Sequence, residues 1–275
     1  MNGSHIKYLL VGAGGAGSAA AVEIRRLDSA GSILLIGQEH NRPYFRPALS
    51  KEYLRREKSR QELATKPVGW FREHNIDLRT GQRVTHLDTM RRAVTLDNGE
   101  SISFEQLLLA TGSSPKLLSV PGADLPNVFY LRTIDDCDRL HHALDKAKAE
   151  GRAHSVGPAR GKAVIVGSGL LAVEVAASFR QMGIHSELVV GRSHPWNKFA
   201  GENTGKFVAR YLEKHDVAVH LGASAERFEG DGRVQRVITS DGRSIVCDFV
   251  VVAIGAVTNR ELLRSTPISA EKAIL

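Results

Sequence analysis

The sequence GAGGAG at residues 12–17 decides the fold, because it follows the apolar run Ile6–Val11 and opens an amphipathic segment that reaches about Leu27. In a Gly-x-Gly-x-x-Gly turn the first glycine permits a tight bend, the second lets the backbone approach a pyrophosphate, and the third lets helix and strand pack closely. The four glycines of this stretch are Gly12, Gly14, Gly15 and Gly17. With Ile33–Ile36 as the next strand, the pattern predicts a strand, helix, strand unit that binds a dinucleotide.

The same layout occurs a second time. GSGLLA at residues 167–172 also lies between an apolar strand and an amphipathic helix, and each turn has a matching downstream strand, LLLATG at 107–112 and VVVAIG at 250–255. The two downstream strands are 143 positions apart. The candidate binding residues in these segments are Ala110, Thr111, Gly112, Gly167, Gly169, Leu170, Leu171 and Gly255. A duplicated turn indicates two bound nucleotides with electron transfer between them.

These repeats predict an α/β fold with two Rossmann-like, three-layer dinucleotide-binding domains, the second inserted in the first and each carrying a small antiparallel meander. We expect residues 1–119 plus 248–275 to form the first domain, which Phe249–Ala253 rejoins as a returning strand, and residues 120–247 to form the second. In the first domain the last meander strand, Ile102–Phe104, is expected to precede a separate parallel strand, Leu107–Ala110. The segment 151–161 reads as a loose connection, and 261–275 carries no clear pattern.

The residues after the second strand of each unit bear on ribose recognition, where an acid normally holds the hydroxyls. In the first unit Glu39 is the candidate, with Gln38 as a neutral substitute. In the second unit Arg192 occupies that place, and a cation there favours the 2′-phosphate of NADPH over NADH. His194 and Lys198 are expected to assist Arg192, although a solvated Arg192 without a ligand is also compatible with the sequence.

Composition excludes several classes of protein. A chain of 275 residues with 42% hydrophobic side chains can bury a core, and its longest apolar run, Phe249–Val257, is too short to cross a bilayer. The first strand starts too early for a secretion signal, and Cys137 and Cys247 lie too far apart for a redox pair, so we expect a cytoplasmic protein without a membrane span. The eleven histidines are scattered, and no metal site is expected.

The net charge of +7 leaves the partner open. The cationic run Arg55–Arg60 is interrupted by an acid and reads either as a solvated face or as a docking surface for an acidic electron-carrier protein. Nucleic acid is the weaker alternative, because only the net charge supports it.

RPYFRPALSK at residues 42–51 resembles a segment of the FAD-dependent pyridine nucleotide-disulfide oxidoreductases, of the ferredoxin and rubredoxin reductase type that includes apoptosis-inducing-factor-like proteins. LATG at 109–112, LRTIDD at 131–136 and residues 167–174 match that family in order and spacing. The resemblance implies that the first domain binds FAD and the second NAD(P)H. It also implies that Arg46, Lys51 and Arg132 face FAD, and that Lys51 pairs with Glu174 at the centre where hydride arrives.

The implied activity is hydride transfer from NAD(P)H to FAD, followed by electron delivery to a small iron–sulfur acceptor such as a ferredoxin or rubredoxin. Members of the family continue with a strand ending in Gly-Asp, whose aspartate binds the FAD ribitol, and with a C-terminal interface domain; both would lie beyond Leu275. The chain is therefore expected to be either a piece of a full reductase or a short form that retains nucleotide binding without turnover. A regulatory or interaction protein is the remaining alternative.

Overall fold

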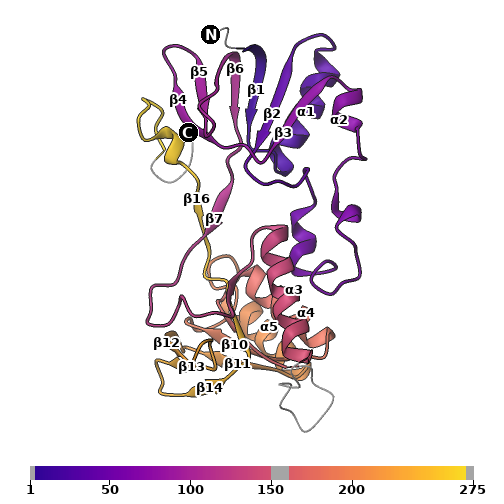
Figure 1. The fold of residues 1–275 in the computed structure, drawn as a ribbon. Coiled ribbons are helices and arrows are strands. Elements are labelled where there is room, and N and C mark those ends of the chain that lie inside the picture. The colour runs from indigo at the N-terminus through magenta and orange to yellow at the C-terminus, as the bar shows by residue number, and fades with distance from the viewer. Residues whose placement is uncertain (1–3, 150–160, 271–275) are drawn as a thin grey trace. The chain divides into compact units, whose positions relative to one another are not determined.

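The computed structural model describes residues 4–149 and 161–270, and the chain divides into two compact units (Figure 1). The first unit contains Met1–Phe45, Arg60–Ser114 and Val257–Leu275, and the second contains Arg46–Ser59 and Pro115–Ala256. Most of the loose connection expected at 151–161 lies outside the described residues. Among the described residues, no helix has the length and apolar character that a membrane crossing requires.

A six-stranded sheet forms the first unit, in the order β3-β2-β1-β6-β5-β4. Neighbours from β3 to β6 pair in parallel, whereas β5 and β4 pair antiparallel at one edge. The strands are β1 (Ser4–Val11), β2 (Ile33–Gly37), β3 (Ile76–Thr80), β4 (Val84–Asp88), β5 (Ala93–Leu96) and β6 (Ser101–Leu109), with helices α1 (Gly15–Leu27) and α2 (Trp70–Glu73). Short 3-10 turns lie at Gln61–Leu63 and Glu261–Leu263.

The core of the first unit has two sides because successive strand residues point to opposite faces. Leu10 and Leu35 pack with Ala21 of α1 and Phe71 of α2. Leu9 belongs to the other cluster, in which β1 and β2 pack with the meander strands and the C-terminal segment. The buried members of that cluster are Leu9, Val11, Leu34, Ile36, Leu87, Val94, Leu96, Ile102, Phe104 and Leu263. Helices, sheet and meander thus form the three predicted layers.

The second unit repeats this plan with a parallel sheet in the order β11-β10-β9-β15-β8. In both sheets the strands lie in the order third, second, first and returning strand of the unit, so β11-β10-β9-β15 corresponds to β3-β2-β1-β6. This correspondence confirms the predicted duplication and α/β class. The elements are β8 (Val128–Tyr130), α3 (Ile134–Ala149), β9 (Lys162–Val166), α4 (Leu170–Gln181), β10 (His185–Val190), α5 (Glu202–Lys214), β11 (Val217–Leu221), β12 (Ala225–Glu229), β13 (Arg236–Thr239), β14 (Ser244–Val246) and β15 (Phe249–Val252).

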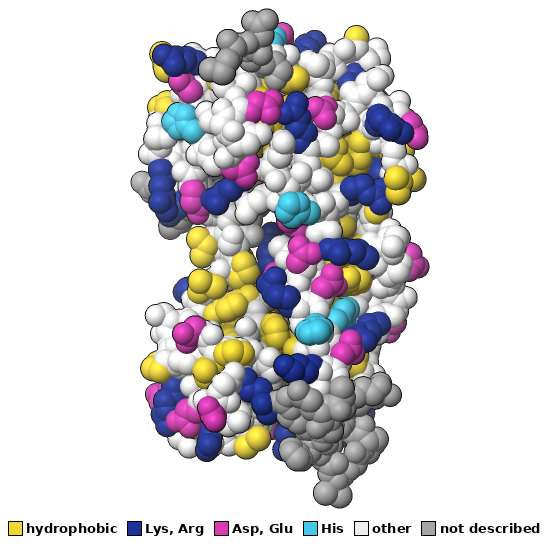
Figure 2. Space-filling model, in the orientation of Figure 1, with side chains coloured by type: hydrophobic (Ala, Val, Ile, Leu, Met, Phe, Trp, Pro, Cys, Tyr) yellow, Lys and Arg dark blue, Asp and Glu magenta, His cyan; other side chains and the backbone are white. Residues whose placement is uncertain are grey.

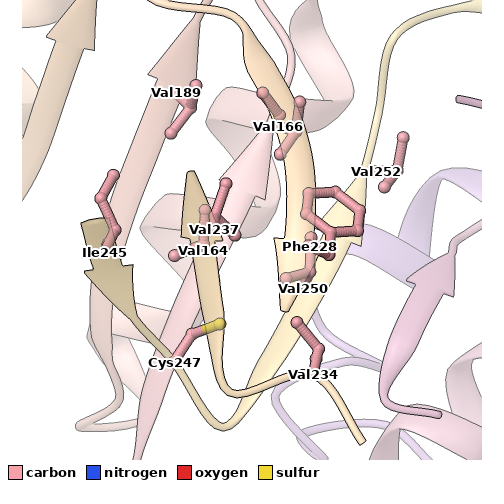
Figure 3. Close-up of a cluster of buried hydrophobic side chains, with 11 residues drawn as sticks. Val164, Val166, Val189, Phe228, Val234, Val237, Ile245, Cys247, Val250 and Val252 are labelled. Carbon is pink, nitrogen blue, oxygen red and sulfur yellow. The ribbon is translucent and has the colours of Figure 1, made fainter. Parts of the chain in front are cut away.

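Strands β12, β13 and β14 form a separate antiparallel sheet that covers one face of the parallel sheet. Figure 3 shows Phe228, Val237 and Ile245 of this meander directed toward valines of β9, β10 and β15. Helix α4 contributes Phe179, whose ring packs edge to face on the Phe249 ring, with 5.4 Å between the ring centroids. Both rings are fully buried, so the helix is fixed against the strand that closes the sheet.

Two expectations about strands are wrong. The two predicted strands Ile102–Phe104 and Leu107–Ala110 are not separate, because one continuous strand, β6, runs through both and ends at Leu109. It pairs antiparallel with β5 from Ser101 to Ser103 and parallel with β1 from Ile102 to Leu109. Glu105 and Gln106, which interrupt the apolar pattern, are exposed residues within that strand.

The strand at Phe249–Val252 does not return to the first sheet. β15 pairs with β9 and β8, so it closes the sheet of the second unit. The chain leaves and re-enters the first unit along β7 (Ser113–Pro115) and β16 (Ala256–Thr258), which form a two-stranded sheet. The second unit also includes the 3-10 helix Arg46–Ser50 and the following turns, which the sequence assigned to the first domain.

Candidate functional site

The first glycine of each turn lies beneath a backbone carbonyl. Gly12 has φ +115°, and a Cβ added there would lie 2.1 Å from the Ala110 carbonyl oxygen. Gly167 has φ +154°, and its added Cβ would lie 2.2 Å from the Ala253 carbonyl oxygen. Ala110 and Ala253 occupy equivalent places after β6 and β15. The duplication therefore extends to individual atoms, and both positions require glycine.

The second glycine of each turn faces open space at the start of a helix. Gly14 precedes α1 with φ −82° and ψ −166°, and Gly169 precedes α4 with φ −83° and ψ −178°. An added Cβ at either glycine, or at Gly15, would meet no described atom within 4 Å. Open helix N-termini present N–H groups and partial positive charge, which suits the oxygens of a diphosphate. These two turns fit the phosphate groups of two dinucleotides.

The third position of the motif packs helix against strand. A Cβ at Gly17 would lie 1.9 Å from the Gly12 carbonyl oxygen, so α1 approaches too closely for any side chain. Ala172 occupies the corresponding place in α4 and is fully buried. Leu170 and Leu171 begin that helix, and Leu170 is exposed.

A cavity of about 420 Å³ adjoins the first turn. Its lining includes Gly12, Gln38, Gln82, Thr111 and Asn259. Of the two ribose candidates, Gln38 therefore lines the cavity. Glu39 instead accepts a hydrogen bond from the buried Tyr44 hydroxyl at 2.6 Å. Either role in ribose binding stays a prediction.

Asn259 is a part of this region that the sequence analysis did not identify. Its Nδ2 donates to the Thr111 carbonyl at 2.9 Å, its carbonyl accepts from Thr111 Oγ1 at 2.7 Å, and its N–H donates to the Gly112 carbonyl at 3.0 Å. These contacts join Asn259 to Thr111 and Gly112, which follow β6. Gly255 lies before β16, where its carbonyl accepts from the Lys116 N–H at 2.9 Å.

In the second unit, the loop after β10 contacts the glycine turn. The Trp196 N–H donates to the Ser168 carbonyl at 2.6 Å, and Ser168 Oγ donates to Asn197 Oδ1 at 3.3 Å. Arg192, in the same loop, is exposed. His194 is buried, at 7% exposed, and its Nδ1 lies 2.9 Å from the Pro195 carbonyl, so its assistance to Arg192 stays a prediction. Lys198 is exposed.

Lys51 and Glu174, which the resemblance pairs, lie together within the second unit. Lys51 Nζ is 2.7 Å from Glu174 Oε1, and the two side chains are 38% and 32% exposed. Ser50 Oγ donates to the other carboxylate oxygen at 2.6 Å, and the Pro47 carbonyl accepts from Lys51 Nζ at 3.3 Å. The ammonium thus has two partners, while more than a third of the Lys51 side chain stays accessible.

Arg46 and Arg132 also lie side by side, since Arg46 Nη1 donates to the Arg132 carbonyl at 2.5 Å. The Arg132 N–H in turn donates to Asp136 Oδ2 at 2.9 Å. The four residues that the resemblance assigns to flavin, Arg46, Lys51, Arg132 and Glu174, therefore all belong to the second unit. Their roles toward a cofactor stay predictions.

Two cations of the run Arg55–Arg60 form ion pairs within the protein. Arg55 Nε lies 2.7 Å from Glu57, and Arg56 Nη2 lies 2.9 Å from Asp145 of α3. On the face drawn in Figure 2, Lys and Arg side chains are interspersed with Asp and Glu side chains. Both cysteines are free and buried, and burial raises the pKa of each thiol to about 12. Across residues 4–149 and 161–270, no three His, Cys, Asp or Glu side chains are grouped for a metal ion.

Two Rossmann-like units, each with an open glycine turn at a helix N-terminus, are typical of proteins with two dinucleotide-binding domains. The chain belongs to the pyridine nucleotide-disulphide oxidoreductase family, whose model matches residues 6–274. It is 33% identical over 271 residues to the rhodocoxin reductase of Rhodococcus erythropolis, covering 98% of this chain and 60% of that protein. It is also 33% identical to the ferredoxin–NAD(+) reductase component of the biphenyl dioxygenase system of Paraburkholderia xenovorans (strain LB400), covering 97% and 62%.

Solved structures give the same picture. The ferredoxin reductase for the CYP199A2 system of Rhodopseudomonas palustris matches with a TM-score of 0.89 and 29% identity, over 98% of this chain and 63% of that one. The covalent putidaredoxin reductase–putidaredoxin complex matches with the same TM-score and coverage at 25% identity. The chain thus spans about three fifths of the length of these relatives.

Proposed function

We propose that this chain binds FAD in its first unit and NADPH in its second, as part of a flavin-dependent NAD(P)H oxidoreductase. The reductase would pass a hydride from NAD(P)H to FAD and electrons onward to a small ferredoxin or rubredoxin. Relatives named as ferredoxin–NAD(+) reductase components support this proposal, as does family membership. The two free, buried cysteines fit the reducing cytoplasm that we propose as its location.

The observation that carries the proposal is the ion pair between Lys51 and Glu174 in the second unit, with 2.7 Å between Nζ and Oε1. FAD, when bound, supplies the chemistry of accepting a hydride and releasing electrons singly. The protein's part is to orient the reactants and to fix charge near the reacting atoms. The Lys51 ammonium, held by Glu174 and by the Pro47 carbonyl, would present a positive charge toward the group that gains electrons.

The turn residues fit the phosphate groups of both cofactors. Gly12, Gly14, Gly15 and Gly17 would hold the FAD pyrophosphate, and Gly167 and Gly169 the NADPH pyrophosphate, because the space before each helix is open. As the family resemblance implies, Arg46 would lie near phosphate and flavin, and Arg132 would face FAD.

Arg192 supports NADPH as the electron donor rather than NADH. It is an exposed cation at the position where an acid would bind the unphosphorylated ribose. A guanidinium can pair with a 2′-phosphate through two hydrogen bonds, which NADH does not offer. An acidic iron–sulfur protein is the proposed acceptor, since the chain carries a charge of +7.

Absorption spectroscopy tests the proposal. The purified chain is incubated with FAD, freed of unbound flavin and titrated with NADPH without oxygen. We expect a bound flavin spectrum that bleaches on addition of NADPH and recovers when an oxidised ferredoxin is added. A colourless protein that binds NADPH would contradict electron transfer and favour nucleotide binding without turnover. Salt-sensitive binding of DNA by a colourless protein would favour an interaction protein instead.

A further inference from the structure

Helix α4 holds Ser50 at its hydroxyl and at its carbonyl. Ser50 Oγ donates to Glu174 Oε2 at 2.6 Å, and the Ser50 carbonyl accepts from Ser178 Oγ at 2.6 Å. Glu174 and Ser178 are four residues apart and therefore lie on one helix face. Ser50 is 4% exposed and Ser178 is 2% exposed, so water does not compete freely for these contacts.

The hydrogen bonds at Ser178 have a fixed direction. Arg55 Nη1 lies 3.2 Å from Ser178 Oγ. A guanidinium can only donate and a carbonyl can only accept, so the single Ser178 hydroxyl proton goes to Ser50 while an oxygen lone pair receives Arg55. Ser178 thus joins two points of the Arg46–Ser59 segment to α4.

The Ser50 carbonyl belongs to the peptide group that leads into Lys51. That group is planar, so fixing its oxygen fixes the direction in which the chain enters Lys51. The other end of the same group is also held, because the Lys51 N–H donates to the Ala48 carbonyl at 3.0 Å. The Ala48 contact is internal to the segment. Ser178 is the residue that aligns this peptide group with the helix carrying Glu174.

We propose that Ser178 is a positioning residue for the hydride-transfer centre, acting through the Ser50–Lys51 peptide group to set the Lys51 ammonium against Glu174. This inference rests on the proposed function of the Lys51–Glu174 pair. Ser178 touches neither reacting group. Its loss leaves the ammonium, the carboxylate and the Ser50 hydroxyl chemically intact and removes only the alignment between them.

Two variants separate the hydrogen bond from packing. Ser178→Ala removes the hydroxyl and some volume, whereas Ser178→Cys keeps the volume with a much weaker donor. The first readout needs no flavin: the rate at which acetic anhydride acylates Lys51 in the flavin-free protein, measured by peptide mass spectrometry. Lys206, which is 2.6 Å from Glu202 on α5, serves as the reference lysine in every sample.

We expect both variants to acylate Lys51 about threefold to tenfold faster, the range for loss of one hydrogen bond, with Lys206 unchanged. In the FAD-loaded protein, flavin reduction should slow by a similar factor while the NADPH dissociation constant stays within about twofold of wild type.

Unchanged Lys51 acylation in folded Ser178→Ala would overturn the inference. The inference would also be overturned if Lys51 acylated at the wild-type rate in Ser178→Cys but faster in Ser178→Ala. The volume of the side chain, and not its hydrogen bond, would then account for the effect. Failure of the wild-type protein to oxidise NADPH would count against the proposed function alone, since the acylation result can still be read.

Discussion

Replacing Gly14 with alanine should weaken FAD binding about tenfold to hundredfold while leaving the fold intact. The backbone at Gly14 has φ −82° and ψ −166°, which any residue adopts, and the added methyl group would meet no described atom within 4 Å. Alanine is a poorer helix N-cap than glycine, so we expect a loss of stability of at most about 1 kcal/mol. The methyl group instead fills the space through which phosphate oxygens reach the N–H groups of α1.

The expected loss of affinity follows from those N–H groups. A hydrogen bond to a charged group contributes roughly 1.5 to 3 kcal/mol, so losing one weakens FAD binding about tenfold to hundredfold. Gly12→Ala is the matched control because its methyl group would lie 2.1 Å from the Ala110 carbonyl oxygen at a φ of +115°. Backbone strain and overpacking there cost roughly 1 to 3 kcal/mol each, which lowers the melting temperature by about 5 to 20 °C.

The measurements are FAD titration by quenching of flavin fluorescence and differential scanning calorimetry of the flavin-free variants. Wild-type FAD affinity in Gly14→Ala would refute the assignment of this turn to the pyrophosphate. A drop in melting temperature as large as that of Gly12→Ala would show that the space beside Gly14 is not open.

Three further predictions concern single side chains. Lys51→Ala should slow flavin reduction in stopped-flow experiments more than it weakens NADPH binding, whereas Lys206→Ala should alter neither; equal reduction rates for Lys51→Ala and wild type would refute the role of Lys51. Arg192→Glu should shift the ratio of kcat/KM values from NADPH toward NADH, and an unchanged ratio would count against the 2′-phosphate contact. The hydrogen bond from Lys7, with backbone N–H groups after it, holds the pKa of Asp28 well below its usual range. Asp28 therefore stabilises the fold above its unfolded pKa of about 4 and loses this effect as the pH falls further. Asp28→Asn should lower the melting temperature at pH 7 and flatten its decline between about pH 4 and 2, so parallel declines in the two proteins would contradict this reasoning.

The glycine turns could be predicted from the sequence because the backbone at Gly12 and Gly167 leaves no room for a side chain. The order of the elements followed from the repeated pattern of strand, glycine turn and helix. The strand at Phe249–Val252 could not be assigned to its sheet. All four of its residues are buried, and a strand buried on both faces has the same apolar pattern in either parallel sheet. Only its pairing with β9 and β8 decides the matter.

The candidate site divides in the same way. Gly14 and Gly169 follow from a local motif, whereas Lys51 and Glu174 could be linked only through the family resemblance. Asn259, Trp196 and Ser178 were missed because each acts through a backbone contact with a residue distant in the sequence. Such contacts depend on how the chain folds back and leave no spacing to recognise.

The Arg46–Ser59 segment belongs to the second unit but lies in the sequence between two segments of the first, which limits how the two units can be expressed separately. The chain passes from one unit to the other after Phe45, Ser59, Ser114 and Ala256, so neither unit corresponds to one continuous stretch of gene. A recombinant fragment covering 115–256 would lack the Arg46–Ser59 segment, which packs on part of α4. The Glu174 carboxylate and the Ser178 hydroxyl would then lose the hydrogen bonds that they form with Ser50 in the intact chain. Engineers who wish to transplant the second unit should therefore graft residues 46–59 onto it through a designed linker.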